Sequence, residues 1–161
     1  MKDILSFETV ALDDENSTLV IIDQTQLPGR VEILHLATQQ EIFDAIYLLK
    51  VRGAPAIGVA AAFGIYLAAK QITTDDYAQF LQQYKKAGDY LESSRPTAVN
   101  LAWALRRMEQ VVLKHADFSV EQIKTLLLRE CLAIKEEDTQ MCRRIGEHGL
   151  SVLKDGAGIL T

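Results

Sequence analysis

The segment PAIGVAAAFGIYLAAKQ, residues Pro55 to Gln71, decides what kind of fold this chain can form. Its composition predicts one helix, and that helix is apolar on every side. Because a helix without a polar face must be surrounded by protein, we expect it at the centre of a helical bundle. Gly58 and Gly64 lie within it, although each costs about 1 kcal/mol of helix propensity relative to alanine. Close packing or the approach of a ligand is the expected compensation.

The same region does not have the character of a membrane span. The apolar run covers residues 54–69, consists mostly of alanine, and contains a proline and two glycines. A membrane-spanning helix needs about 20 strongly apolar residues. Residues 1–12 include acidic side chains and lack the apolar region of a signal peptide. We therefore expect a cytoplasmic protein that makes no contact with a membrane.

Residues 1–36, upstream of the apolar helix, have strand character. The three runs that carry it are Phe7–Leu12, Thr18–Asp23 and Val31–Leu36. Turn-forming residues separate them, with acidic residues and asparagine in the first connection and Pro28-Gly29 in the second. Short connections between successive strands favour antiparallel pairing, so residues 1–36 are predicted to form a small antiparallel β-meander.

Residues 38–154 are predicted to form the helical bundle. Thr38 with Glu41, and Ser119 with Gln122, fit capping boxes that mark helix starts, and Thr74 is a third expected cap. The expected helices cover about 38–51, 55–71, 75–91, 97–115 and 120–154, the last being a long connecting helix with a possible break near Gly146 or Gly149. The predicted fold class is α+β, with an amino-terminal domain over residues 1–154.

Residues 155–161 have a different character. Asp155-Gly156 is expected to end the long helix, and Gly158–Thr161 is predicted to be a buried strand. A single strand needs partners to form a sheet. This segment is therefore predicted to be the start of a second, truncated carboxy-terminal domain.

Composition excludes several classes of function. The chain has 161 residues, a net charge of −5 and a pI of about 5.2, so sequence-independent binding of nucleic acid, which needs surplus Lys and Arg, is not expected. Cys131 and Cys142 are eleven residues apart in one predicted helix, about 16 Å along its axis, which is too far for a disulfide. The three histidines are scattered, and no metal site and no cofactor are predicted.

Two segments have the composition of an anion site. In Arg52-Gly53-Ala54-Pro55 and in Arg95-Pro96-Thr97, an arginine lies beside a proline at a predicted helix start. A helix amino terminus presents free N–H groups and the positive end of the helix dipole, and a guanidinium group adds two donors that match a phosphate. Asn100 is a weaker candidate, as a pocket amide or an exposed residue.

Other prominent side chains have simpler interpretations. Trp103 and Tyr66 are expected in the core, and Arg106-Arg107 and Arg143-Arg144 on solvated faces.

These two segments also resemble the signature motifs of a known family. The stretch Val51–Ala62, VRGAPAIGVAAA, and the stretch Ser94–Leu101, SRPTAVNL, are similar in order and separation to those of methylthioribose-1-phosphate isomerases, which are related to initiation factor 2B subunits. The resemblance extends over essentially the whole chain. It implies a cytoplasmic homodimer in which a small amino-terminal domain precedes a larger, Rossmann-like domain.

The resemblance also implies an activity. Members of this family interconvert 5-methylthioribose 1-phosphate and 5-methylthioribulose 1-phosphate in methionine salvage. On the matching positions, Arg52, Gly53, Ala54 and Arg95 are expected to bind the phosphorylated pentose. The family's catalytic cysteine follows the segment that resembles Gly158–Thr161, and its catalytic aspartate comes much later. No catalytic residue is therefore expected in residues 1–161, and this chain alone is predicted to be inactive.

Three alternatives stay open. The substrate could be another 5-deoxy pentose 1-phosphate, because the pocket for the 5-substituent cannot be recognised in the sequence. The protein could be a non-catalytic interaction subunit like those of initiation factor 2B. It could also be a stand-alone helical dimerisation module.

Overall fold

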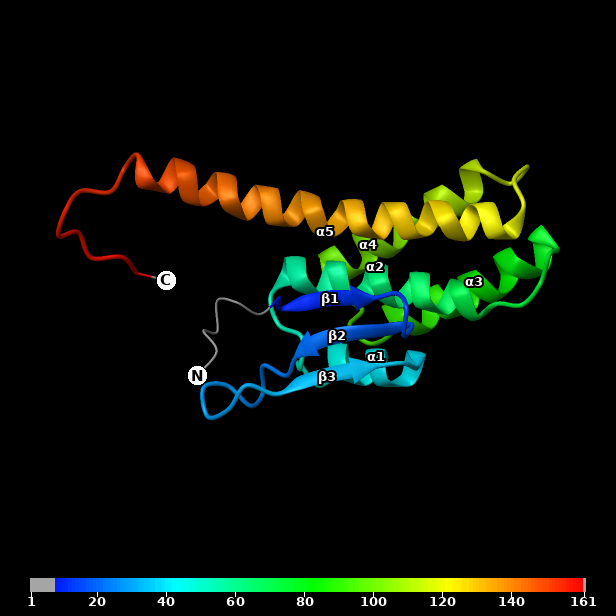
Figure 1. Cartoon of the computed structure of the whole chain (residues 1–161), viewed down its shortest axis with the longest axis horizontal. Coiled ribbons are helices and arrows are strands. Elements are labelled where there is room, and N and C mark those ends of the chain that lie inside the picture. The colour runs from blue at the N-terminus through cyan, green and yellow to red at the C-terminus, as the bar shows by residue number, and fades with distance from the viewer. Residues whose placement is uncertain (1–7, 161) are drawn as a thin grey trace.

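The computed structural model of the chain describes residues 8–160. Within this range the elements run in the order β1 (Val10–Asp13), β2 (Thr18–Ile22), β3 (Ile33–Leu36), α1 (Gln39–Tyr47), α2 (Ala54–Gln71), α3 (Tyr77–Glu92), α4 (Val99–Lys114) and α5 (Val120–Leu150). This order of a few strands followed by helices confirms the α+β class (Figure 1).

The three strands form an antiparallel sheet in the order β1-β2-β3, as a meander requires. Val10 pairs with Ile21 across β1 and β2, and Leu19 pairs with Leu36 across β2 and β3. Leu19 and Ile21 are fully buried, so one face of the sheet contributes to the core. The predicted meander is confirmed, although β3 begins two residues later than expected and Phe7 lies outside the described residues.

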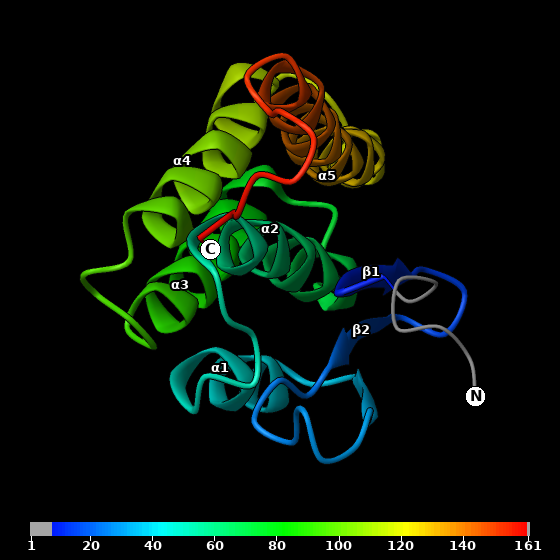
Figure 2. The ribbon, with the colours of Figure 1, turned by 90° about the vertical axis from the view of Figure 1, so that its left-hand side faces the viewer.

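Helix α2 is the centre of the molecule, as its composition predicts. It packs against α1, α3, α4, α5 and the first two strands, and Figure 2, viewed along the bundle, shows the other elements arranged around it. All residues from Ile57 to Ala69 are buried. At Gly64, an added Cβ would lie 3.0 Å from Cγ2 of Ile42, so this glycine allows α1 to pack closely against α2.

Local signals place most helix starts correctly. The capping boxes at Thr38 and Ser119 are both formed. The cap predicted at Thr74 is wrong, because α3 starts at Tyr77 and its N-cap is Asp76, whose carboxylate accepts a hydrogen bond from the Gln79 amide at 2.8 Å. The Thr74 hydroxyl instead accepts from the Asp76 amide, in a turn ahead of the helix.

Helix α5 has 31 residues, which is about 46 Å of helix. Its buried residues end at Ile134, and its carboxy-terminal end projects beyond the body of the bundle (Figure 1). It is continuous through Gly146 and Gly149 and ends at Leu150, so the expected break and the expected extension to residue 154 are both wrong. The structure identifies no helix among residues 8–160 that is long and apolar enough to span a membrane.

The strand predicted at Gly158–Thr161 is not formed by the residues that the structure describes. Residues 157–160 have no regular secondary structure and are exposed, and Thr161 lies outside the described range. A strand is stabilised by a hydrogen-bonded neighbour, and none of the described residues pairs with this segment. The predicted division into residues 1–154 and a further domain stays a prediction.

Candidate functional site

The first predicted corner forms the start of α2. Gly53 is the N-cap and has φ +93° and ψ 128°, a backbone conformation that is essentially restricted to glycine. Gln24, in the connection between β2 and β3, fixes the backbone just before Gly53. Its amide donates to the Lys50 carbonyl at 3.0 Å and its side chain to the Arg52 carbonyl at 3.4 Å. The need for positive φ explains why glycine follows Arg52.

The second corner connects α3 to α4. Ser94 is buried, and its hydroxyl donates to the Leu91 carbonyl at 2.6 Å. The Ala98 amide donates to the Arg95 carbonyl at 2.9 Å, which closes a turn around Pro96. These bonds fix the backbone on either side of Arg95 immediately before α4 begins.

The two helix starts lie against each other. A Cβ added at Gly58, one turn into α2, would lie 3.1 Å from the Asn100 carbonyl oxygen at the start of α4. The missing side chain therefore allows the two amino termini to approach closely. This contact is the compensation that the sequence predicted for a glycine inside α2.

One cleft of about 310 Å³ opens between these helix starts. Its lining residues are Gly53, Ala54, Ile57, Arg95, Thr97, Ala98, Val99 and Asn100. Three of the four predicted site residues, namely Gly53, Ala54 and Arg95, thus line one cleft. Arg52 precedes Gly53 and is exposed, but it is not among the lining residues.

The cleft is suited to an anion. Helices α1, α3 and α5 have side-chain N-caps, whereas the caps of α2 and α4, Gly53 and Ala98, provide no side-chain hydrogen bond. The free N–H groups of these two helices are therefore available to a ligand. No carboxylate lines the cleft, and within residues 8–160 neither Arg52 nor Arg95 forms an ion pair.

The lining residues cannot perform acid–base or nucleophilic chemistry near neutral pH. They include an arginine, an asparagine and a threonine, but no carboxylate, histidine or cysteine. Cys131 lies in the core, where burial raises the pKa of its thiol to about 12, and Cys142 is exposed on the projecting part of α5. Among residues 8–160 there is no cluster of three potential metal ligands. The lining is therefore suited to binding an anion and not to acid–base or nucleophilic chemistry.

Two residues near the cleft, Asn100 and Trp103, are not placed there by the sequence patterns. Asn100 is half-buried and lines both the cleft and an adjoining groove. Trp103 was expected in the core but is 43% exposed and lines the groove. The spacing of Leu101, Leu105 and Met108 defines the buried face of α4, and position 103 falls off that face, which is the signal that could have identified it.

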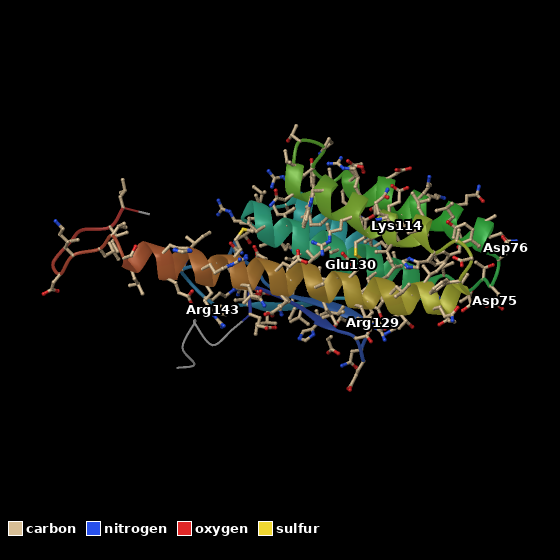
Figure 3. All side chains as sticks on the ribbon, turned by 90° about the horizontal axis from the view of Figure 1, so that it is seen from above. Asp75, Asp76, Lys114, Arg129, Glu130 and Arg143 are labelled. Atoms are coloured by element: carbon tan, nitrogen blue, oxygen red, sulfur yellow. The ribbon has the colours of Figure 1, made fainter. Side chains whose placement is uncertain are left out.

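Arg107 is expected on a solvated face from the sequence, but in the structure it is bound to side chains of α5. Its guanidinium donates to Glu137 at 2.7 Å and to Glu130, both on α5, and lies 5.5 Å from the centroid of the Trp103 ring. In Figure 3, Glu130 lies on the side of α5 that faces α4, and Arg129 lies on the opposite side. Hydrogen bonds from Arg107 lower the pKa of the Glu137 carboxyl. Arg107 thus fixes α4 against α5 beside the groove.

Comparison with protein families gives one match for the greater part of the chain. Residues 50–161 match the family described as "Initiation factor 2 subunit family". The chain is 52% identical over 149 residues to a methylthioribose-1-phosphate isomerase of Parabacteroides distasonis, covering 92% of this chain and 44% of that protein. It is 55% identical over 141 residues to a 5-deoxyribose 1-phosphate isomerase of Moorella thermoacetica, covering 88% and 40%.

Two solved structures are also similar to this chain. A 5-methylthioribose 1-phosphate isomerase from Pyrococcus horikoshii superposes with a TM-score of 0.87 at 36% identity, covering 92% of this chain and 41% of that chain. The delta subunit of translation initiation factor eIF-2B from A. fulgidus superposes with a TM-score of 0.83 at 42% identity, covering 94% and 43%. The chain therefore spans less than half the length of these relatives.

Proposed function

Because the chain belongs to the initiation factor 2 subunit family, we propose that it is the phosphate-binding, amino-terminal part of an aldose–ketose isomerase. The proposed substrate is a pentose 1-phosphate with an apolar 5-position, specifically 5-methylthioribose 1-phosphate, which is converted to 5-methylthioribulose 1-phosphate in methionine salvage. The observation that carries this proposal is the cleft in which Gly53, Ala54 and Arg95 meet at two uncapped helix starts.

Each residue has a distinct part in this proposal. The free N–H groups at the starts of α2 and α4 donate to phosphate oxygens, and the guanidinium of Arg95 adds a two-pronged, charged donor. Gly53 lets the backbone reach the ligand, since no side chain covers it. Arg52, exposed beside the cleft, provides a second positive charge for the phosphate.

Isomerisation of the sugar needs more than binding of its phosphate. The anomeric oxygen carries the phosphate, so the ring cannot open as a free hemiacetal, and an acid must deliver a proton to the ring oxygen. Hydrogen must then move from C2 to C1 in a site shielded from water. Since no carboxylate, histidine or cysteine lines the cleft, we assign these steps to a cysteine and an aspartate in the carboxy-terminal part of the whole protein, as the resemblance implies. Binding of the phosphate orients the reacting carbons towards these groups.

The relatives support two closely similar substrates. One is named for 5-methylthioribose 1-phosphate and another for 5-deoxyribose 1-phosphate. These sugars share the phosphate and differ at C5. The cleft is equally suited to both, so the distinction depends on the surface that receives the 5-substituent. Cytoplasmic location and homodimer formation remain predictions.

The second candidate function is that of a non-catalytic interaction subunit. The similarity to the A. fulgidus structure named as an eIF-2B delta subunit favours it. Such a role does not need a free anion site. A cleft with two uncapped helix starts, beside an Arg95 that forms no ion pair within residues 8–160, is instead expected of a protein that binds a small phosphorylated ligand.

The test is isomerase activity of the whole protein that contains residues 1–161. We expect turnover of 5-methylthioribose 1-phosphate, and Arg95→Ala should reduce kcat/KM about 10- to 150-fold, the loss of one charged hydrogen-bonding group of about 1.5–3 kcal/mol. Arg52→Ala should act in the same direction. Arg129→Ala is the matched control, because Arg129 is exposed in the middle of α5 and belongs to neither corner. An inactive whole protein, or unchanged kinetics in both Arg52→Ala and Arg95→Ala, contradicts the proposal.

A further inference from the structure

A second hollow, which we term the apolar groove, adjoins the cleft. It has a volume of about 410 Å³ and shares Val99 and Asn100 with the cleft. Its walls come from α2, α4 and α5, with the apolar side chains Pro55, Val59, Val99, Trp103, Ile134 and Met141. Val99 and Met141 are 75% and 55% exposed. Large apolar side chains gathered around a hollow next to a polar site are typical of a ligand pocket.

We infer that the apolar groove holds the 5-substituent of the sugar whose phosphate lies in the cleft, and that Trp103 and Met141 determine the specificity for that substituent. This inference rests on the proposed function and deepens it. It assigns the part of the substrate that distinguishes a 5-methylthio sugar from a 5-deoxy or a 5-hydroxy sugar.

The spacing along α4 supports this assignment. Trp103 lies four residues after Val99, about 6 Å along the helix axis. The start of α4 therefore presents free N–H groups to the cleft, and the next turn presents an aromatic ring to the groove. A pentose 1-phosphate has the same polarity along its carbon chain, with the phosphate on C1 and the substituent on C5. Asn100 lies at the boundary, where its amide can hydrogen-bond to the hydroxyl groups between the two ends.

Charge fixes the direction in which the sugar lies. The cleft contains Arg95 and no carboxylate. The groove includes two carboxylates, Glu137 and Asp138, and one guanidinium, Arg106. Glu137 is paired with Arg107, so the charged groups at the groove give it no net positive charge. A phosphate is therefore attracted into the cleft and not into the groove. The apolar end of the sugar consequently enters the groove.

The indole of Trp103 is held in place for this role. The Arg107 guanidinium lies against its ring and is itself fixed by hydrogen bonds to Glu130 and Glu137 of α5. Trp103 nevertheless remains 43% exposed. A preformed, partly exposed aromatic surface can bind a thioether group without first paying the entropy of ordering its own side chain.

The experiment measures kcat/KM of the whole protein with 5-methylthioribose, 5-deoxyribose and ribose 1-phosphates. Trp103→Ala should lower the value for the methylthio sugar about tenfold more than the value for ribose 1-phosphate, within the range expected when one apolar group loses its pocket. Met141→Gln should act in the same direction and decides the question if Trp103→Ala fails to fold. Leu113→Ala on α4 and Leu132→Gln on α5 are matched controls, since both residues are exposed but do not line the groove.

Three outcomes overturn the inference, and they can be distinguished from one another. If the wild-type protein is active but both groove variants lose activity equally with all three sugars, or lose none, the groove does not hold the 5-substituent. An equal loss indicates that the groove is instead occupied by another part of the protein or by a second copy. If the wild-type protein turns over none of the sugars, the proposed function itself fails, and this inference fails with it.

Discussion

Replacing Gly53 by alanine tests the backbone geometry from which the cleft is built. Gly53 has φ +93° and ψ 128°, a region that costs a residue with a side chain about 1–3 kcal/mol. An added Cβ would have no atom within 4 Å, so neither a steric clash nor a new contact changes this value. The full cost is a backbone cost, and we expect Gly53→Ala to lower the free energy of unfolding by about 1–3 kcal/mol.

Gly88 provides a control of opposite sign. It lies inside α3, where alanine is favoured over glycine by up to about 1 kcal/mol, and its added Cβ would make an ordinary contact of 4.0 Å with Ile65. Gly88→Ala should therefore be neutral or stabilising. Urea unfolding of both variants measures the difference, which we expect to be about 1–4 kcal/mol. If Gly53→Ala is as stable as the wild type, the reasoning about the start of α2 is wrong.

Three further changes test other parts of the structure. Ser119→Ala removes the cap of α5 and should lower stability by about 1 kcal/mol in urea unfolding; an unchanged midpoint would argue against the cap. Burial raises the pKa of the Asp14 carboxyl, but hydrogen bonds from Lys70 and Tyr66 outweigh the effect of burial, so the pKa lies below its ordinary value. The ionised Asp14 carboxylate therefore stabilises the folded state above about pH 4, and this contribution is lost as the pH falls further. Asp14→Asn should cost less than about 1 kcal/mol at pH 7 and flatten the decline in stability below pH 4, and a parallel decline would refute this. A thiol reagent at pH 8 should modify Cys142 quickly and Cys131 only after unfolding; rapid modification of both would contradict the burial.

Local patterns predicted the framework of the fold well. The capping boxes at Thr38 and Ser119 depend on residues three positions apart, so they can be recognised without tertiary information. The central position of α2 follows from its lack of a polar face. The cap at Thr74 was wrong because Thr74 and Asp76 are both good caps, and only the three-dimensional path of the chain selects between them.

The site was harder to predict than the framework. The motifs predicted that the two corners bind one pentose, and Gly53, Ala54 and Arg95 do line one cleft. The contact that brings the corners together, between Gly58 and the Asn100 carbonyl, could not be recognised in the sequence. Trp103 was misplaced because a tryptophan is usually buried. Its exposure follows from which face of α4 packs on α2, and that is decided by distant residues.

The central claim is that the starts of α2 and α4, together with Arg95, bind a phosphate. Titration of inorganic phosphate into the isotopically labelled chain, followed by the backbone amide resonances, tests this claim most directly. We predict saturable shifts confined to the amides of Gly53, Ala54, Val99 and Asn100, and much weaker binding in Arg95→Ala. Shifts elsewhere on the molecule, or equal binding by the variant, would contradict the account.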